Sequence, residues 1–184
     1  MKLIEDLVEL QPEMQNWRRD IHAHPEIAFE EHRTASIVAE KLESFGLDVE
    51  TGIAGTGVVG TLKRGTGNRA IGLRADLDAL LINEANEFEH KSKNPGKMHA
   101  CGHDGHTTML LGAAKYLAEK GNFNGTINFI FQPAEENEGG GRAMIEEGLC
   151  EKYPVESVYG MHNWPGMPVG TCAIKPGPLM AAVD

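Results

Sequence analysis

The sequence is poor in cysteine, in basic residues and in long apolar segments, and each shortage excludes a class of protein. Its 3 cysteines in 184 residues are too few and too widely spaced for a disulfide framework, so we expect reduced thiols. Its 17 basic and 27 acidic residues give a formal net charge of -10, which would repel nucleic acid and anionic membranes. Acidic residues interrupt the apolar ones in the opening segment MKLIEDLVEL, which therefore cannot serve as a signal-peptide core. These shortages predict a cytoplasmic protein without a nucleic-acid or membrane partner.

The glycine-rich segments lack the surroundings of a nucleotide-binding site. Gly55, Gly57 and Gly60 match the dinucleotide pattern G-x-G-x-x-G, but that pattern must follow a strand and open a helix. Here the glycines lead into the strand-like segment VVGTL, so a turn before a hairpin is the better interpretation. The segment EGGGR at 138–142 lacks the G-K-[ST] ending of a P-loop. Neither segment therefore supports nucleotide binding.

What the sequence does contain is an alternation of amphipathic helices and short apolar strands. With 41% apolar and 24% charged residues, it has the composition of an ordinary globular domain. Apolar residues at helical spacing predict helices over residues 3–22 and 104–119, and a third helix that ends at Gly46. Short apolar runs bounded by turn-forming or charged residues predict strands at 58–62, 70–74, 126–131 and 157–161. This alternation indicates the α/β class, with a mostly parallel sheet flanked by helices.

Three of the predicted strands run directly into polar side chains, which are Asp76 and Asp78, Glu135 and Glu136, and His162. Ligands of open α/β folds bind at the carboxyl ends of the strands, and parallel strands end at the same edge of a sheet. We therefore expect these acidic and imidazole groups to converge.

The segment HACGHDGH, residues 99–106, has the composition of a metal site. A structural zinc site needs four protein ligands, usually with paired cysteines, whereas this segment has one cysteine. A catalytic site needs fewer ligands for each metal, an open position for water and a carboxylate that acts as a base. Glu135 and Glu136 offer a base and a ligand side by side, and His162 offers a nitrogen donor. These residues favour a catalytic metal centre.

Five motifs together resemble a known family. In order along the chain they are RRDIHAHPEIAFEEHRTA, LRADLDAL, MHACGHDGHT, FQPAEENEGGGRAMIEEG and GMHN. They resemble the amidohydrolase branch of the aminoacylase and carboxypeptidase G metallopeptidase family, which includes hippurate hydrolases, auxin-conjugate amidohydrolases and N-acetyl-diaminopimelate deacetylases. The resemblance covers nearly the whole chain. It implies a zinc-exopeptidase-like α/β domain that binds two divalent metal ions, with an inserted lid domain that also forms the dimer surface.

The resemblance assigns roles to individual residues. It implies metal ligands at Cys101, His103, Glu136 and His162, and a general base at Glu135. We interpret Asp76 and Asp78 as carboxylates that orient the ligands without binding metal. A thiolate, imidazoles and a carboxylate suit zinc or manganese, and also cobalt or nickel. A water molecule that bridges the two ions would attack the amide carbonyl as Glu135 takes its proton, and Glu135 would then protonate the leaving amine.

The resemblance gives no ligand role to four other histidines. His99 and His106 lie within HACGHDGH but outside the ligand pattern, so we expect local hydrogen bonds or contacts that orient the ligands. His22 and His24 belong to the first motif, and packing or capping at a helix end explains them equally well.

The chain departs from the family pattern in one loop and in its length. The usual D-A-L-P reads DALL at residues 78–81, so a proline that stiffens the loop beside the metals is missing. Members of the family are longer, with a lid domain and a further histidine ligand near the C-terminus. We therefore expect residues 1–184 to be the N-terminal part of the catalytic domain, truncated before the lid and inactive alone, and the full-length protein to form a homodimer.

The interpretation that these observations favour is a metal-dependent amidohydrolase acting on small N-acyl amino acids, such as hippurate or N-acetyl amino acids. A dipeptidase or aminopeptidase on the same scaffold is the alternative within enzymes. A non-catalytic metal-binding remnant is the alternative outside them.

Overall fold

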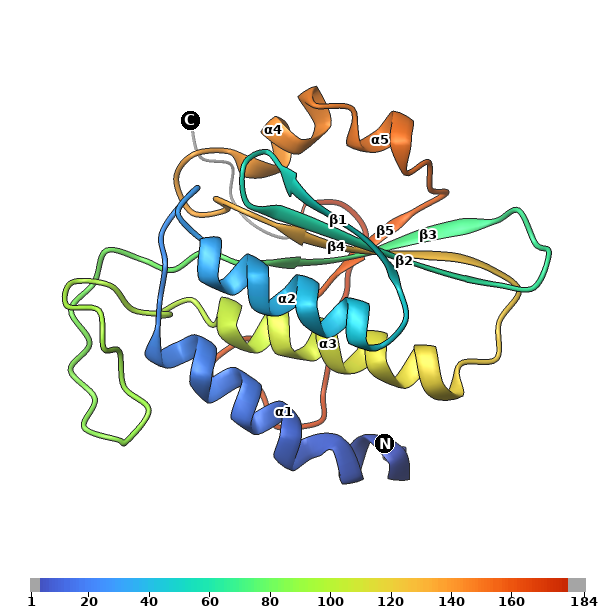
Figure 1. The fold of residues 1–184 in the computed structure, drawn as a ribbon. Helices are drawn as coiled ribbons and strands as arrows, with labels where there is room; N and C mark the ends of the chain where they lie inside the picture. Colours follow the sequence, from blue (N-terminus) through green and yellow to red (C-terminus); the bar gives the residue numbers. More distant parts are fainter. Residues whose placement is uncertain (1–3, 179–184) are drawn as a thin grey trace.

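Five strands form one mixed sheet in the computed structural model, which describes residues 4–178 (Figure 1). The strands are β1 (Asp48–Ile53), β2 (Gly57–Arg64), β3 (Ala70–Asp76), β4 (Gly125–Gln132) and β5 (Val158–Gly160). Their order across the sheet is β1-β2-β4-β3-β5. The strands β4, β3 and β5 run parallel, whereas β2 is antiparallel to both of its neighbours. The three parallel strands therefore end at the same edge of the sheet.

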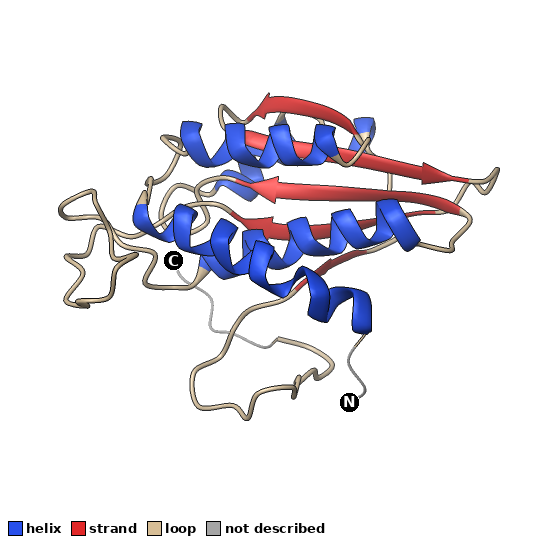
Figure 2. Ribbon diagram, turned by 60° about the horizontal axis from the view of Figure 1, so that its bottom comes forward, coloured by secondary structure: helices blue, strands red, loops and turns tan. Residues whose placement is uncertain are grey.

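Helices cover both faces of this sheet. On one face lie α2 (His32–Ser44) and α3 (His103–Lys120), and α1 (Glu5–Ala23) packs against α3 (Figure 1, Figure 2). On the other face α4 (Gly140–Glu146) contacts β4 and is followed by α5 (Leu149–Lys152). The predicted α/β class is confirmed, and the sheet is mixed rather than mostly parallel because β2 runs against the parallel strands. None of the helices within residues 4–178 is both long and apolar enough to cross a bilayer.

The main core lies between the sheet and the three helices α1, α2 and α3. Val38 and Leu42 of α2 contribute to it, together with Phe129 and Phe131 of β4, and all four are fully buried. Because side chains alternate along a strand, Ile130 of β4 points to the opposite face and joins a smaller core beneath α4. Burial of each large apolar side chain stabilises the fold by about 1.5–3 kcal/mol. The two cores hold β4 rigidly at the centre of the sheet.

The observed elements agree with most of the predicted ones. The helices predicted at 3–22 and 104–119 are α1 and α3, and the four predicted strands are β2, β3, β4 and β5. Gly57 opens β2, and the preceding turn joins it to β1 in an antiparallel pair, as expected for glycines that lead into a hairpin. Three short or exposed elements, β1, α4 and α5, have no counterpart among the predictions.

The start of α3 brings the HACGHDGH segment to the sheet edge. Gly102 precedes this helix with a φ of 99°, a left-handed conformation that glycine adopts without strain. A side chain at this position would also collide with Asn163, because its Cβ would lie 2.6 Å from Asn163 Oδ1. The sharp turn at Gly102 places His103 and His106 on the first turn of α3, where both are buried.

Candidate metal centre

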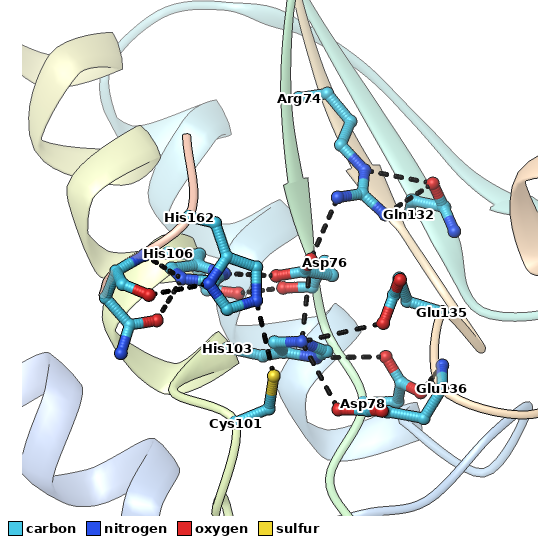
Figure 3. A network of polar contacts seen from close by, with 12 residues as sticks. Arg74, Asp76, Asp78, Cys101, His103, His106, Gln132, Glu135, Glu136 and His162 are labelled. Atoms are coloured by element: carbon cyan, nitrogen blue, oxygen red, sulfur yellow. Dashed lines mark hydrogen bonds and ion pairs between the residues drawn. The ribbon is translucent and has the colours of Figure 1, made fainter. Parts of the chain in front are cut away.

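The residues to which the sequence assigns a role lie together at the carboxyl edge of the sheet (Figure 3). They come from the ends of β3, β4 and β5 and from the start of α3, and they are Asp76, Asp78, Cys101, His103, Glu135, Glu136 and His162. Segments far apart in the sequence thus form one cluster. The predicted convergence is confirmed, whereas the role of each residue stays a prediction.

His103 lies at the centre of the cluster and is fully buried. Its Nδ1 lies 3.2 Å from Asp78 Oδ1, so an N–H at this position donates to the carboxylate and leaves Nε2 with its lone pair. Nε2 faces three carboxylates, with Asp76 Oδ2 at 3.6 Å, Glu136 Oε1 at 3.6 Å and Glu135 Oε2 at 3.8 Å. These separations are too long for hydrogen bonds. They leave room between the imidazole and the carboxylates.

Cys101 and His162 lie on another side of the same imidazole. Cys101 Sγ is 3.3 Å from His162 Nε2. With His103 these two residues form a group whose donor atoms lie within 4.8 Å of one another, and His103, Glu135 and Glu136 form a second such group. Asp76, His103 and His106 form a third group, and the three groups together offer enough donors for two neighbouring metal ions.

The donor atoms fit such ions. His103 Nε2 and Glu136 Oε1 are buried without a hydrogen-bond partner, which is costly for polar atoms unless a further group binds them. A divalent cation between them would satisfy both atoms. The set combines one sulfur with nitrogen and oxygen donors, which suits borderline ions such as zinc better than magnesium or calcium.

The pKa shifts of Cys101 and His103 are also compatible with a bound cation. Burial, and then the negative charge of Glu136 close by, raise the pKa of the Cys101 thiol to about 12. Burial alone would lower the pKa of His103, but its hydrogen bond to Asp78 and the charge of Asp76 outweigh burial and raise it. The neighbouring carboxylates favour the protonated form of both groups, and for Cys101 burial contributes more than they do. A bound cation would compensate the negative charge of these carboxylates and favour the thiolate.

Asp76 is held by residues other than the predicted ligands. Its Oδ1 lies 2.7 Å from His106 Nδ1, and Arg74 Nη1 donates to its Oδ2 at 2.8 Å. Burial alone would raise the pKa of Asp76, but the hydrogen bond with His106 and the charges of His103 and Arg74 lower it to about 2. Asp76 is therefore an ionised carboxylate beside His103. Asp78 differs, because it contacts His103 directly and its Oδ2 accepts the Glu136 backbone N–H at 2.9 Å.

Several residues of the cluster have no predicted role. The guanidinium of Arg74 donates to Gln132 Oε1 as well as to Asp76 (Figure 3). The Asn163 backbone N–H donates to His106 Nε2 at 3.0 Å. Arg74 stands two residues before Asp76 on the same strand, and this spacing is the signal that could have placed it on the same face. Gln132 and Asn163 come from other segments, and no spacing in the sequence indicates that they lie beside Arg74 or His106.

The remaining histidines lie outside the cluster. His22 Nδ1 lies 2.9 Å from Asp104 Oδ2 and its Nε2 lies 3.0 Å from Glu84 Oε1, whereas His24 Nδ1 lies 2.8 Å from the Asp20 carbonyl. His99 is buried with no partner for either ring nitrogen, and burial lowers its pKa to about 4. The expected local hydrogen bond is thus found for His106 and is absent for His99.

The loop that lacks the family's proline is anchored by its backbone. Leu80 and Met98 exchange two backbone hydrogen bonds of 3.0 Å each, which form an isolated antiparallel bridge. Leu81, in the place of the proline, is 70% exposed and contributes little to packing. The bridge fixes the segment directly after Asp78 in the absence of proline.

Comparisons with known proteins show similarity along nearly the whole chain. The chain is 51% identical over its whole length to the hippurate hydrolase of Campylobacter jejuni and covers 48% of that protein. It is 45% identical to an N-acyl-L-amino acid amidohydrolase of Geobacillus stearothermophilus, with 96% of this chain and 48% of that protein covered. The chain thus spans about half the length of these curated relatives.

Solved structures give the same result. A Bacillus subtilis dinuclear metal binding peptidase from the M20 family superposes with a TM-score of 0.88 and 40% sequence identity, over 94% of this chain and 48% of that one. The sequence profile of peptidase family M20/M25/M40 matches residues 72–182, which include every residue assigned to the candidate metal centre. The chain therefore belongs to peptidase family M20/M25/M40.

Proposed function

We propose that this chain carries the metal centre of an amidohydrolase that cleaves the amide bond of N-acyl amino acids, with hippurate or N-acetyl amino acids as substrates. The observation that supports the proposal most directly is the group of thiol, imidazole and carboxylate donors around the unpartnered His103 Nε2. Relatives that hydrolyse such amides share this half of their sequence with the chain.

The proposal includes the place of the chain in the whole protein. Residues 1–184 match the N-terminal half of their relatives, so we assign them to the N-terminal part of the catalytic domain. A lid domain, a further histidine ligand, a homodimer and a cytoplasmic location stay predictions for the protein that the whole gene encodes.

Cys101, His103, Glu136 and His162 are the residues that would hold two divalent ions, zinc or manganese, with cobalt or nickel as alternatives. When bound, such ions polarise the amide carbonyl and lower the pKa of water at the site. Asp78 serves by fixing the His103 ring and the Glu136 backbone at once.

Glu135 has the position of a general base. Its side chain is 41% exposed while its Oε2 lies 3.8 Å from His103 Nε2, so it reaches the open side of the cluster. There its carboxylate accepts a proton from the attacking water and afterwards donates it to the leaving amine nitrogen. One carboxyl group thus serves both halves of the hydrolysis.

The test is the variant Glu135→Gln in the protein encoded by the whole gene. We expect kcat for hippurate or an N-acetyl amino acid to fall about 10²- to 10⁴-fold, because proton transfer is lost. Metal content should stay near that of the unmodified protein, because the other donors remain. Glu138→Gln is the matched control, since Glu138 is an exposed carboxylate of the same loop.

The same assays decide between the alternatives. Turnover close to normal in Glu135→Gln would contradict the base assignment. Faster cleavage of unblocked dipeptides than of N-acyl amino acids would favour the peptidase alternative. Metal binding without turnover of either substrate class would favour a non-catalytic remnant.

A further inference from the structure

Glu31 is a buried carboxylate that the proposed chemistry does not use. It immediately precedes α2 and its side chain is fully buried. It belongs to the motif RRDIHAHPEIAFEEHRTA, which supplies none of the predicted ligands. Burial of a carboxylate destabilises the fold unless its oxygens accept hydrogen bonds, so the hydrogen-bond partners of Glu31 indicate its role.

Each oxygen of Glu31 has one partner, and the partners come from two distant loops. The Thr56 hydroxyl, in the turn between β1 and β2, donates to Oε2 at 2.5 Å. The Ala134 backbone N–H, in the loop after β4, donates to Oε1 at 2.8 Å. The segment before α2 approaches the end of β4 in the fold, as Figure 1 shows. Glu31 therefore connects the segment before α2, the turn between β1 and β2, and the loop that carries Glu135 and Glu136.

The backbone of Ala134 is unusual at this point. Ala134 has a φ of 51°, in the left-handed region that residues with a Cβ rarely adopt, and it is fully buried. Such a conformation persists only where neighbouring contacts hold it. One contact is the Gly140 N–H, which donates to the Ala134 carbonyl at 2.9 Å, and the other is Glu31. The next two residues along the chain are Glu135 and Glu136.

We propose that Glu31 is a positioning residue, whose carboxylate holds Ala134 in the left-handed conformation and thereby aims Glu135 and Glu136 at His103. Without this acceptor the Ala134 backbone relaxes to a conformation that alanine prefers. The peptide planes that follow then rotate, and both carboxylates leave their places 3.6–3.8 Å from His103 Nε2. The effect on metal binding rests on the proposed function. The effect of Glu31 on the conformation of Ala134 does not.

Glu31→Met tests whether the Glu31 carboxylate keeps Ala134 in this conformation, because methionine has a similar length and no strong acceptor. In the metal-free protein we expect hydrogen exchange of the backbone amides at 134–136 to accelerate at least tenfold, since the Ala134 N–H loses its acceptor. In the same variant, zinc affinity measured by calorimetry should fall about 10- to 100-fold, as for other residues that orient metal ligands.

Two further variants separate positioning from general damage to the fold. Glu31→Gln should keep most of the zinc affinity, because its amide oxygen still accepts from Ala134 and its amide nitrogen can donate to the Thr56 hydroxyl. Glycine adopts a positive φ freely, so Glu31→Met should cost much less zinc affinity in an Ala134→Gly background than in the unmodified chain.

Glu26→Met is the matched control. Glu26 lies in the same segment and its side chain accepts from the backbone N–H groups of Arg33 and Thr34, whereas none of its side-chain hydrogen bonds reaches the loop after β4. This variant should lower stability while zinc affinity and exchange at 134–136 stay unchanged.

Unchanged exchange at 134–136 in Glu31→Met would overturn the proposal. Accelerated exchange with undiminished zinc affinity would show that Glu31 does not position the metal ligands. An equal loss of zinc affinity in the unmodified chain and in the Ala134→Gly background would show the same. If the unmodified chain bound no zinc, the proposed function would fail, and the exchange measurement would still decide whether Glu31 holds the loop.

Discussion

At the scale of single residues, Cys101 shows how strongly this site depends on a cation. Its thiol has a pKa of about 12 because it is partly buried and faces Glu136, Asp76 and Glu135. Without metal it is therefore protonated at neutral pH, whereas only a thiolate binds zinc well. Metal binding must expel this proton, so affinity should rise with pH.

We expect zinc binding at pH 7 to release about one proton fewer in Cys101→Ser than in the unmodified protein. Calorimetric enthalpies measured in two buffers with different ionisation enthalpies give the number of protons released. Cys150→Ser is the control, since Cys150 is an exposed thiol of α5, which contributes no residue to the cluster. Equal proton release by Cys101→Ser and the unmodified protein would show that the thiol takes no part in binding.

At the scale of elements, Asp78 joins three of the four segments that form the candidate metal centre. It follows β3, one of its oxygens contacts His103 at the start of α3, and the other accepts the Glu136 N–H from the loop after β4. Burial alone would raise the pKa of Asp78, but these hydrogen bonds outweigh it and lower the pKa. The carboxylate thus stays ionised and fixes two predicted ligands relative to each other.

Asp78→Asn should lower zinc affinity about 10- to 100-fold, because an amide cannot accept from both His103 and Glu136. Titration calorimetry on both proteins measures the change. Asp48→Asn, at the exposed start of β1, should leave the affinity as it is. Unaltered affinity in the Asp78 variant would mean that the ligands hold their places without it.

The helices and strands that could be predicted are those with a strong apolar period. The spacing in α1 and α3 and the apolar runs of β2 and β4 reflect burial on defined faces. β1 was not predictable in this way, because it lies at the sheet edge and most of its side chains are partly or fully exposed. α4 starts with two glycines and has 7 residues, too few to display a helical period.

The candidate site was predictable to the extent that motifs encode it. Cys101 and His103 were recognised as part of a dense cluster of donor residues, and Glu135 from its place after a strand. The pairing of Arg74 with Gln132 was not predictable, because it depends on β3 lying beside β4. The contact of Glu31 with Ala134 joins residues 103 positions apart, and no local pattern records such a contact.

At the scale of the whole molecule, two buried carboxylates, Asp76 and Asp104, contribute to the pH dependence of the unfolding free energy at acid pH. Burial alone would raise the pKa of Asp104, but the hydrogen bond with His22 and the charge of Arg18 lower it from 3.8 to about 2. Asp76 shifts equally far. Each contributes about 2 kcal/mol to stability above its unfolded pKa, and this contribution is lost as pH falls from 3.8 toward 2.

The contribution of His22 to stability depends on pH in the opposite direction. Its hydrogen bond to Asp104 raises its pKa above 6.5, so its contribution to stability is present below pH 6.5 and is lost as pH rises through the raised value. His99 has the reverse effect, because burial lowers its pKa from 6.5 to about 4, so the folded protein loses stability as pH falls from 6.5 toward 4. The two carboxylates and His99 together predict that the metal-free protein loses stability as pH falls below 6.5.

Urea unfolding of the metal-free protein at a series of pH values tests this expectation. The unfolding free energy should decline as pH falls below 6.5, and Asp104→Asn should remove about 2 kcal/mol of the decline below pH 3.8. Asp48→Asn should keep the full acid dependence, because Asp48 is exposed. A free energy that stays constant down to about pH 3 would contradict the assignment.

The mixed sheet has a consequence for the order in which the protein folds. β2 pairs with β4 along nearly its whole length, from Val58 with Phe131 to Arg64 with Gly125. The chain between them includes β3, the long loop at 80–98 and α3, so a large loop must close before these hydrogen bonds form. The hairpin of β1 and β2 needs no such closure, so we expect it to form early and β4 to join late. Until it does, Phe129 and Phe131 are exposed to water, and high protein concentration in that interval favours aggregation over the native sheet.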